Sequence, residues 1–212
     1  MTKKLLLICL TASFLLSLAN ADTEVTQFRS KLKLTVFARG NKGQGPMKIV
    51  GKTPSNSIKI PKDSEWGIYL EEKVDPKKLF AECIENGVYN IHFHFVLPKN
   101  YLRGIEKLEG LKTLTFFGTG VNDEDLARIA VLKNLESLTI NGFNKVSSEG
   151  FAHILKLTNL ERLDLSAVQL SDEELLSLKS HTQLKLLSVD KKKYSEDSLN
   201  RLKKALPECT IR

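Results

Sequence analysis

Hydrophobic residues recur at intervals of 23 to 25 residues through the second half of the chain. Each interval starts with an aliphatic anchor residue, and further apolar residues follow it three and five positions later. The anchors are Val88, Leu111, Leu135, Leu160 and Leu184. A fainter copy precedes them, with Ile68, Leu70, Val74 and Leu79 in the matching positions. Because alternating apolar residues are typical of strands, we predict strands near 68–70, 91–93, 114–116, 138–140, 163–165 and 187–189.

The second part of most units carries the signals of a helix start. An apolar residue leads into a residue type that caps helices well, and these cap residues are Asp75, Asn122, Ser147, Ser171 and Ser195. Pro76 suits the first helical position, and Ser171 with Glu174 matches a capping box. Apolar residues then follow at helical spacing. Each unit is therefore predicted to contain a strand, a turn, a capped helix and a return loop.

Residues 22–64 show a period of two instead. In the stretch KLKLTVFAR, apolar residues alternate with polar ones from Lys31 to Val36. The turn-rich stretches GNKGQGP and TPSNS separate it from two short apolar runs, MKIV and IKI. Such runs between turn clusters are typical of strands. We predict a small β cap at the N-terminus, either a hairpin or three strands.

Residues 1–21 have the composition of a secretory signal peptide. Lys3 and Lys4 precede the apolar run LLLICLTASFLLSL, and Ala19-Asn20-Ala21 provides a cleavage site. A transmembrane anchor is the alternative, but the run is shorter than the roughly 20 residues that span a bilayer. We expect a secreted or periplasmic protein that starts at Asp22, with no membrane insertion after cleavage.

A period near 24 residues with the pattern L-x-x-L-x-L is the signature of leucine-rich repeats. Residues 65–212, including the ending LKKALPECTI, resemble secreted bacterial leucine-rich repeat proteins of the cysteine-containing, ribonuclease-inhibitor-like type. The resemblance implies an α/β solenoid of about six strand–helix units. Its parallel sheet would curve, with the helices on the convex side. It also implies an interaction scaffold rather than an enzyme.

The chain departs from the usual repeat after each strand. Where that repeat has a row of asparagines, this chain has Thr119, Asn144, Val168 and Lys192. The resemblance does not extend to residues 22–64.

The apolar strand residues point into the core, so their neighbours face the other way. Equivalent positions then form columns across the concave face, with strands about 4.8 Å apart. Aromatic and arginine side chains are frequent binding hot spots, and Phe117 and Arg162 lie in these columns. We expect a protein partner at this face. The candidate residues are Tyr69, Glu71, His92, His94, Thr115, Phe117, Thr139, Asn141, Arg162, Asp164, Ser188 and Asp190. A flanking column contains Gly67, Asn90, Thr113, Ser137, Arg162 and Leu186.

Two other functions remain open. His92, His94 and Glu71 are metal-ligand types on adjacent strands, which suggests a metal-binding protein or a hydrolase. An open curved sheet gives such a site little shielding, and no G-x-S-x-G or glycine-rich phosphate motif occurs. We therefore predict that the protein is not an enzyme and uses no cofactor.

The second alternative comes from charge. Residues 22–64 contain nine basic and three acidic residues, a balance of +6. A basic segment can attract an anionic partner, so an envelope-associated structural module could bind an anionic polymer through this cap. No aromatic interleaving or nucleic-acid motif is present, so we expect no nucleic acid. The pattern sets no oligomeric state.

Two cysteines, Cys83 and Cys209, remain after the signal peptide. The predicted strand stacking separates them by roughly 24 Å. A disulfide needs α-carbons within about 7 Å of one another. We therefore expect both thiols to be free.

Overall fold

The structure is a computed structural model that describes residues 25–40, 46–54, 57–142 and 145–212. The predicted signal peptide, residues 1–21, lies outside the described residues. So do residues 22–24, 41–45, 55–56 and 143–144.

The described chain contains a nine-stranded sheet in the order β11-β10-β9-β8-β7-β6-β5-β2-β3. Every pair from β5 to β11 is parallel. These strands are β5 (Glu65–Leu70), β6 (Asn90–Phe93), β7 (Thr113–Phe117), β8 (Ser137–Asn141), β9 (Arg162–Asp164), β10 (Leu186–Ser188) and β11 (Thr210–Ile211). The prediction of six neighbouring parallel strands is confirmed, and the strand ends move by a few residues.

The register joins equivalent positions of successive units. Leu138 on β8 lies between Leu114 on β7 and Leu163 on β9. The backbone repeats in the same way, since Glu136 N donates to Lys112 O and Glu161 N donates to Glu136 O, both at 2.8 Å. Successive units therefore add to the sheet in one constant register.

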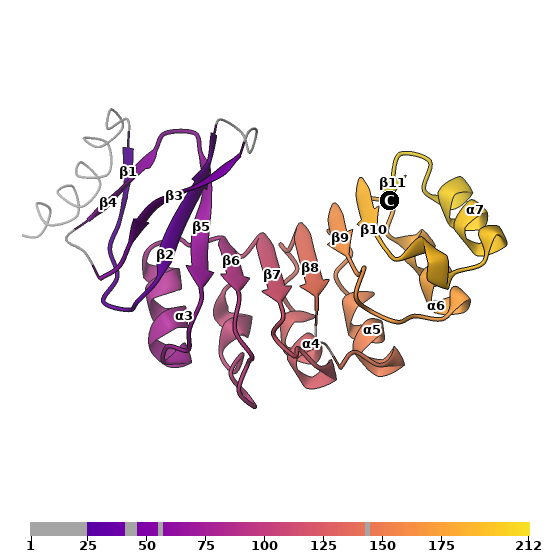
Figure 1. The fold of residues 1–212 in the computed structure, drawn as a ribbon, viewed down its shortest axis with the longest axis horizontal. Helices are drawn as coiled ribbons and strands as arrows, with labels where there is room; N and C mark the ends of the chain where they lie inside the picture. Colours follow the sequence, from indigo (N-terminus) through magenta and orange to yellow (C-terminus); the bar gives the residue numbers. More distant parts are fainter. Residues whose placement is uncertain (1–24, 41–45, 55–56, 143–144) are drawn as a thin grey trace, which may run out of the picture.

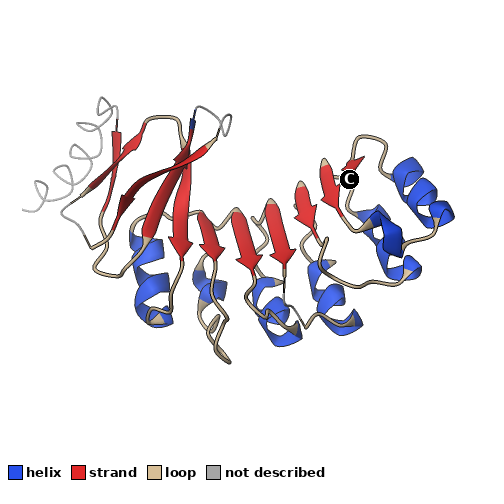
Figure 2. Ribbon diagram, viewed as in Figure 1, coloured by secondary structure: helices blue, strands red, loops and turns tan. Residues whose placement is uncertain are grey.

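Helices cover one face of this sheet (Figure 1, Figure 2). The α-helices are α3 (Pro76–Glu85), α4 (Asp123–Ile129), α5 (Ser148–Ile154), α6 (Asp172–Ser177) and α7 (Glu196–Ala205). The 3-10 helices are η1 (Ile105–Lys107), η2 (Leu178–Ser180) and η3 (Lys191–Lys193). All five predicted cap residues accept a hydrogen bond from a backbone amide of their helix.

One unit departs from the predicted plan. After β6, the chain forms turns and the short η1 in place of an α-helix. Tyr101 anchors these turns, because its hydroxyl donates to Val74 O at 2.8 Å. Gly104 then adopts φ 102°, which a residue with a side chain rarely takes. This segment has no cap residue of the kind that begins the other helices.

The hydrophobic core lies between the sheet and the helices. All five anchors are buried, and so are the two apolar residues that follow each of them. Phe93 and Phe116, on neighbouring strands, stack with ring centroids 5.6 Å apart. The repeating hydrophobic pattern is thus the inward face of the sheet.

The N-terminal strands are joined to the same sheet. β2 (Thr35–Arg39) pairs antiparallel with β5 on one side and with β3 (Met47–Lys52) on the other. β1 (Val25–Phe28) and β4 (Ile58–Pro61) form a separate antiparallel pair. The described cap therefore has four strands in two sheets, where the sequence predicted two or three strands.

The predicted alternation in the cap starts too early. Residues 31–34 are not in a strand, and residues 35–38 are buried on both faces. Val36 and Ala38 join the core, while Phe37 packs on the opposite face against Tyr69 and His92. Because side chains on both faces of β2 are buried, this strand does not show the alternation of apolar and polar residues that is expected of a half-exposed strand.

Gly67 allows this packing of Phe37. A Cβ atom on Gly67 would lie 2.8 Å from the Phe37 ring and 2.7 Å from Asn90 Cβ. Real Cβ atoms do not approach other atoms so closely. Because Gly67 on β5 has no side chain, the Phe37 ring from β2 can pass over it and contact His92 on β6.

The two cysteines are both buried and free, as predicted. Burial raises the pKa of the Cys83 thiol to about 12, so this thiol is inert at neutral pH. Among the described helices, none is long and apolar enough to cross a membrane.

Candidate functional site on the open face of the sheet

The face of strands β5–β10 that points away from the helices is called the open face here. In the described chain no helix covers it (Figure 1). Its main column is confirmed by the strand register, which joins Tyr69, His92, Thr115, Thr139, Asp164 and Ser188 in that order.

A second predicted column, formed by the positions two residues after the first, is less regular; it contains Glu71, His94, Phe117, Asn141, Ser166 and Asp190. Phe117 and Asn141 are paired in the sheet, whereas Glu71, His94 and Asp190 lie beyond the ends of their strands. Asp190 caps η3, and its carboxylate accepts from Lys192 N at 3.3 Å. Strands β9 and β10 are short, so the column ends in turns there.

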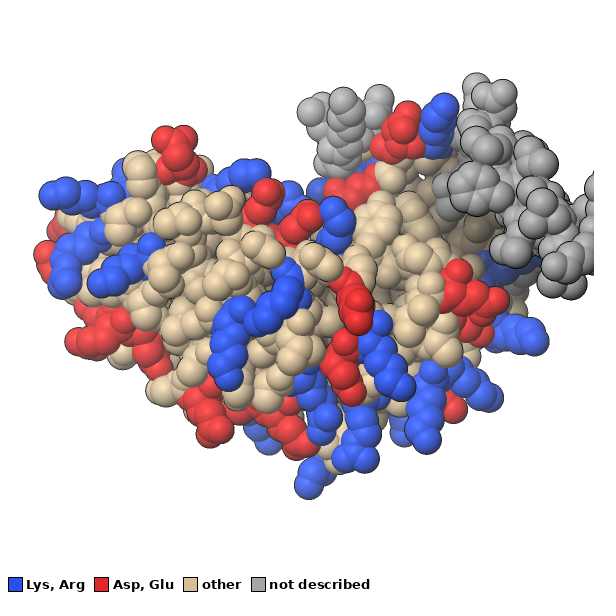
Figure 3. Space-filling model, turned by 180° about the vertical axis from the view of Figure 1, so that it is seen from behind, with Lys and Arg blue, Asp and Glu red and all other residues tan. Residues whose placement is uncertain are grey.

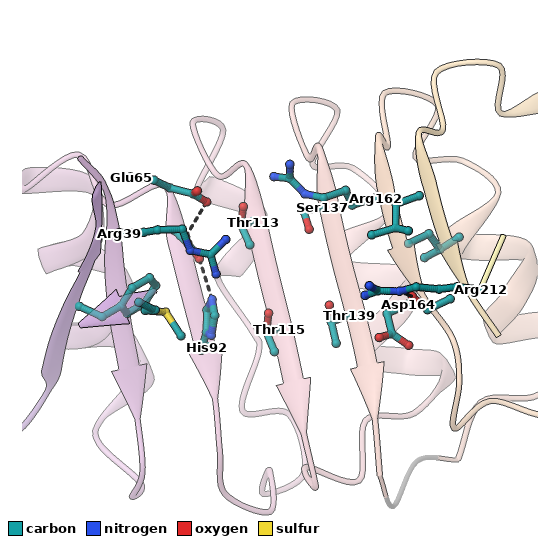
Figure 4. A pocket seen from close by; sticks show the side chains of 16 residues that line it. Arg39, Glu65, His92, Thr113, Thr115, Ser137, Thr139, Arg162, Asp164 and Arg212 are labelled. Atoms are coloured by element: carbon teal, nitrogen blue, oxygen red, sulfur yellow. Dashed lines mark hydrogen bonds between the residues drawn. The ribbon is translucent and has the colours of Figure 1, made fainter. Parts of the chain in front are cut away.

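A trough of about 330 Å³ runs across the open face. Six predicted residues line it: His92, Thr115, Thr139, Arg162, Asp164 and Ser188. Its floor carries the hydroxyl groups of Thr113, Thr115, Ser137 and Thr139 from β7 and β8 (Figure 4). The other six predicted residues do not line it: Tyr69, Glu71, His94, Phe117, Asn141 and Asp190.

Three arginines line the trough. Figure 4 shows Arg39 at one side and Arg162 and Arg212 at the other. Arg212 Nε donates to Ser188 Oγ at 3.0 Å. The side chains of Arg39 and Arg162 form no hydrogen bond or ion pair with any described residue. Two guanidinium groups are thus available to a ligand.

Both carboxylates that line the trough already accept hydrogen bonds. Glu65 Oε1 accepts from Asn90 Nδ2 at 3.4 Å. Asp164 Oδ1 accepts from Ser166 N at 3.0 Å and from Ser166 Oγ at 2.6 Å. Neither carboxylate lies within ion-pair distance of an arginine among the described residues.

His92 is held in a neutral state. Its Nε2 lies 2.9 Å from Asn90 Oδ1, and its ring lies 4.8 Å from the rings of Phe37 and Tyr69. Burial, with smaller contributions from His94 and Arg39, lowers the pKa of His92 to about 4. The imidazole therefore carries no charge at neutral pH.

The geometry gives the metal-site alternative no support. Tyr69 lies 4.8 Å from both histidine rings, which are parallel and 6.3 Å apart. Glu71 faces Lys52, with 3.7 Å between Oε2 and Nζ. Across the described ranges, no group of three or more His, Cys, Asp or Glu side chains is placed to hold a metal ion.

A row of rings borders the trough. Phe37 and Tyr69 lie 4.9 Å apart, Tyr69 and His94 4.8 Å, and His94 and Phe117 5.5 Å. Phe117 ends the row and is 54% exposed. An exposed ring beside polar groups is typical of contact surfaces.

Several residues that line the trough are not among the twelve candidate residues named from the sequence. Asn90, Thr113 and Ser137 belong to the flanking column, which the strand phase did place on this face. Arg39 reaches the trough from β2, and Arg212 reaches it from the residue after β11. Both positions depend on long-range strand pairing, and the local sequence carries no signal for it.

The surface charge of the cap is partly neutralised by neighbours. Lys33 Nζ pairs with Glu72 Oε1 at 2.8 Å, and Lys52 pairs with Glu71. Figure 3 shows basic and acidic side chains interspersed on the face that is visible from behind. Where that face is not covered by grey atoms, the described basic residues of the cap therefore form no continuous patch.

No family model matches the chain, and no curated protein matches it significantly. Fold and site alone define the class of protein. It is an α/β protein whose mostly parallel sheet has helices on one face and a polar trough on the other.

Proposed function

We propose that the chain is an exported leucine-rich repeat protein that binds a protein partner through the open face of its sheet. In this proposal residues 1–21 direct export to the periplasm or the exterior, and the protein is an interaction scaffold rather than an enzyme. The carrying observation is the open face itself, where Phe117 and Arg162 are exposed beside a polar trough.

The repeat assignment is supported by unit-to-unit contacts at equivalent positions. Asn134 Nδ2 donates to Glu109 O at 2.8 Å, and Asn159 Nδ2 donates to Lys133 O at 2.7 Å. Each asparagine directly precedes an anchor leucine and ties its return loop to the loop before. Stacked units of this kind produce a rigid, extended surface, which suits protein recognition.

The binding role predicts a specific pattern of mutational effects. The partner is first captured from the exported fraction with the immobilised protein, and its affinity for purified variants is then measured. Replacing Phe117 and Arg162 with Ala should weaken binding at least tenfold, or about 1.4 kcal/mol. The melting temperature should change little, because both side chains are exposed.

A control pair removes one exposed apolar side chain and one exposed arginine away from the open face. Val131 is 55% exposed after α4, and Arg103 is exposed in the turn before η1. The Val131→Ala and Arg103→Ala pair should leave partner binding intact. If these two changes abolish binding while the open-face pair has no effect, the partner binds elsewhere.

A further inference from the structure

Building on the proposed function, we propose that the trough binds an extended acidic polypeptide segment, with one carboxylate against Arg39 and another against Arg162 and Arg212. The segment would lie across β7 and β8, above the row of hydroxyls. This inference names the chemistry of the partner at the open face.

The arginines supply the charge complementarity. A guanidinium donates two parallel hydrogen bonds to a carboxylate, which makes this pair strong and directional. Arg39 and Arg162 have no partner among the described residues, while Glu65 and Asp164 accept bonds from Asn90 and Ser166. Among the described charged groups of the trough, those that form no hydrogen bond or ion pair are therefore the cationic donors Arg39 and Arg162.

The separation of the arginines sets the length of the ligand. In Figure 4, Arg39 lies over His92 on β6. Arg162 starts from β9 and extends back over β8, and the Arg212 guanidinium lies between β8 and β9. Two to three strand steps from β6 correspond to about 10–14 Å. An extended peptide advances about 3.3 Å per residue, so carboxylates four residues apart span a similar distance.

The floor suits a peptide backbone. Each threonine or serine hydroxyl both donates and accepts hydrogen bonds, so it can pair with either an N–H or a C=O group. The volume of about 330 Å³ falls within the usual range for ligand sites. Because the floor hydroxyls lie on two adjacent strands, they can form hydrogen bonds with more than one residue of the bound peptide.

The trough favours a peptide over an acidic sugar chain or a nucleic acid. Those polymers are commonly held by rings that stack on an exposed aromatic face. Phe37 contributes the trough's phenyl ring and is only 2% exposed. The exposed ring of Phe117 lies outside the trough. Apart from the half-buried His92 ring, the described lining of the trough therefore offers hydrogen bonds and charge rather than a ring on which sugars or bases could stack.

The test is a fluorescence-anisotropy titration of the chain from Asp22 with labelled synthetic peptides at low salt. The probes are Glu-Ser-Ser-Ser-Glu, the same peptide with both Glu changed to Gln, and the shorter Glu-Ser-Glu. We expect the long diacidic peptide to bind at least tenfold more tightly than its Gln form. We also expect it to bind more tightly than the short peptide, which cannot reach both sides.

Variants locate the binding. Arg39→Gln with Arg162→Gln should weaken binding of the long peptide at least tenfold, whereas Arg103→Gln should leave it unchanged. Because Arg39 is half-buried, Arg39→Lys is included; it keeps the charge but loses the two-bond geometry. Its affinity should fall between those of wild type and Arg39→Gln. Melting temperatures verify that each variant is folded.

Three outcomes would overturn the inference. They are no saturable binding of the long peptide, equal binding by the double Gln variant, and binding only of an oligogalacturonate used as the sugar-acid probe. If the captured partner still requires Phe117 and Arg162, the proposed function survives such a failure. If the partner ignores the open face, the proposed function fails independently of the peptide result.

Discussion

Replacing Leu138 with Ala is expected to lower the free energy of unfolding by about 2–5 kcal/mol. Leu138 is fully buried, and its strand register places it between Leu114 and Leu163. Because neighbours on both sides are fixed by the sheet, the cavity left by the substitution cannot collapse well. Urea denaturation of the purified protein measures the loss.

The adjacent residue provides the control. Thr139 is half-buried on the open face, so Thr139→Ala should cost well under about 1 kcal/mol. Equal losses of unfolding free energy at the two positions would contradict the assignment of Leu138 to the buried face of β8 and of Thr139 to the open face.

Acidification from pH 7 to pH 4 is expected to destabilise the protein through His92 by up to about 3 kcal/mol. The pKa of His92 is about 4 in the folded chain, compared with about 6.5 when unfolded. The unfolded chain therefore takes up the proton first as pH falls. The contribution of His92 is fully present above pH 6.5 and is lost progressively as pH falls toward 4.

His181 acts in the same direction, because burial lowers its pKa too. The measurement is urea unfolding at pH 7 and pH 4 for wild type and His92→Gln. Glutamine keeps a hydrogen-bonding group beside Asn90 but does not titrate. The acid-induced loss should therefore be smaller in the variant by up to about 3 kcal/mol. An identical loss in both proteins would show that His92 is not buried as described.

The repeated part of the fold was predictable because its signals are local. Leu114, Leu138 and Leu163 recur with the same spacing, and each strand buries the same face. Asn122 and Ser171 are residue types that favour a helix start, and their side chains accept hydrogen bonds from backbone amides in the first turn of α4 and α6. Period and caps together specified the strands, most of the helices and the outward columns.

The rest depends on contacts between distant parts of the chain. Nothing local to Arg39 indicates that β2 would pair with β5 and deliver its guanidinium to the trough. The pair His92 and His94 suggested metal chemistry, but Phe37 and Tyr69 occupy the space around the first ring. Sequence therefore located the open face, whereas the composition of its trough required the structure.

Methyl NMR of the protein labelled at threonine, with the captured partner added, tests the central claim most directly. Thr113, Thr115 and Thr139 line the trough. Thr158 is exposed in the loop between α5 and β9, and Thr182 is exposed in the loop between η2 and β10. Binding at the open face predicts shifted or broadened signals for Thr115 and Thr139, with Thr158 and Thr182 unchanged. Changes confined to Thr158 and Thr182 would contradict the claim that the open face is the binding surface.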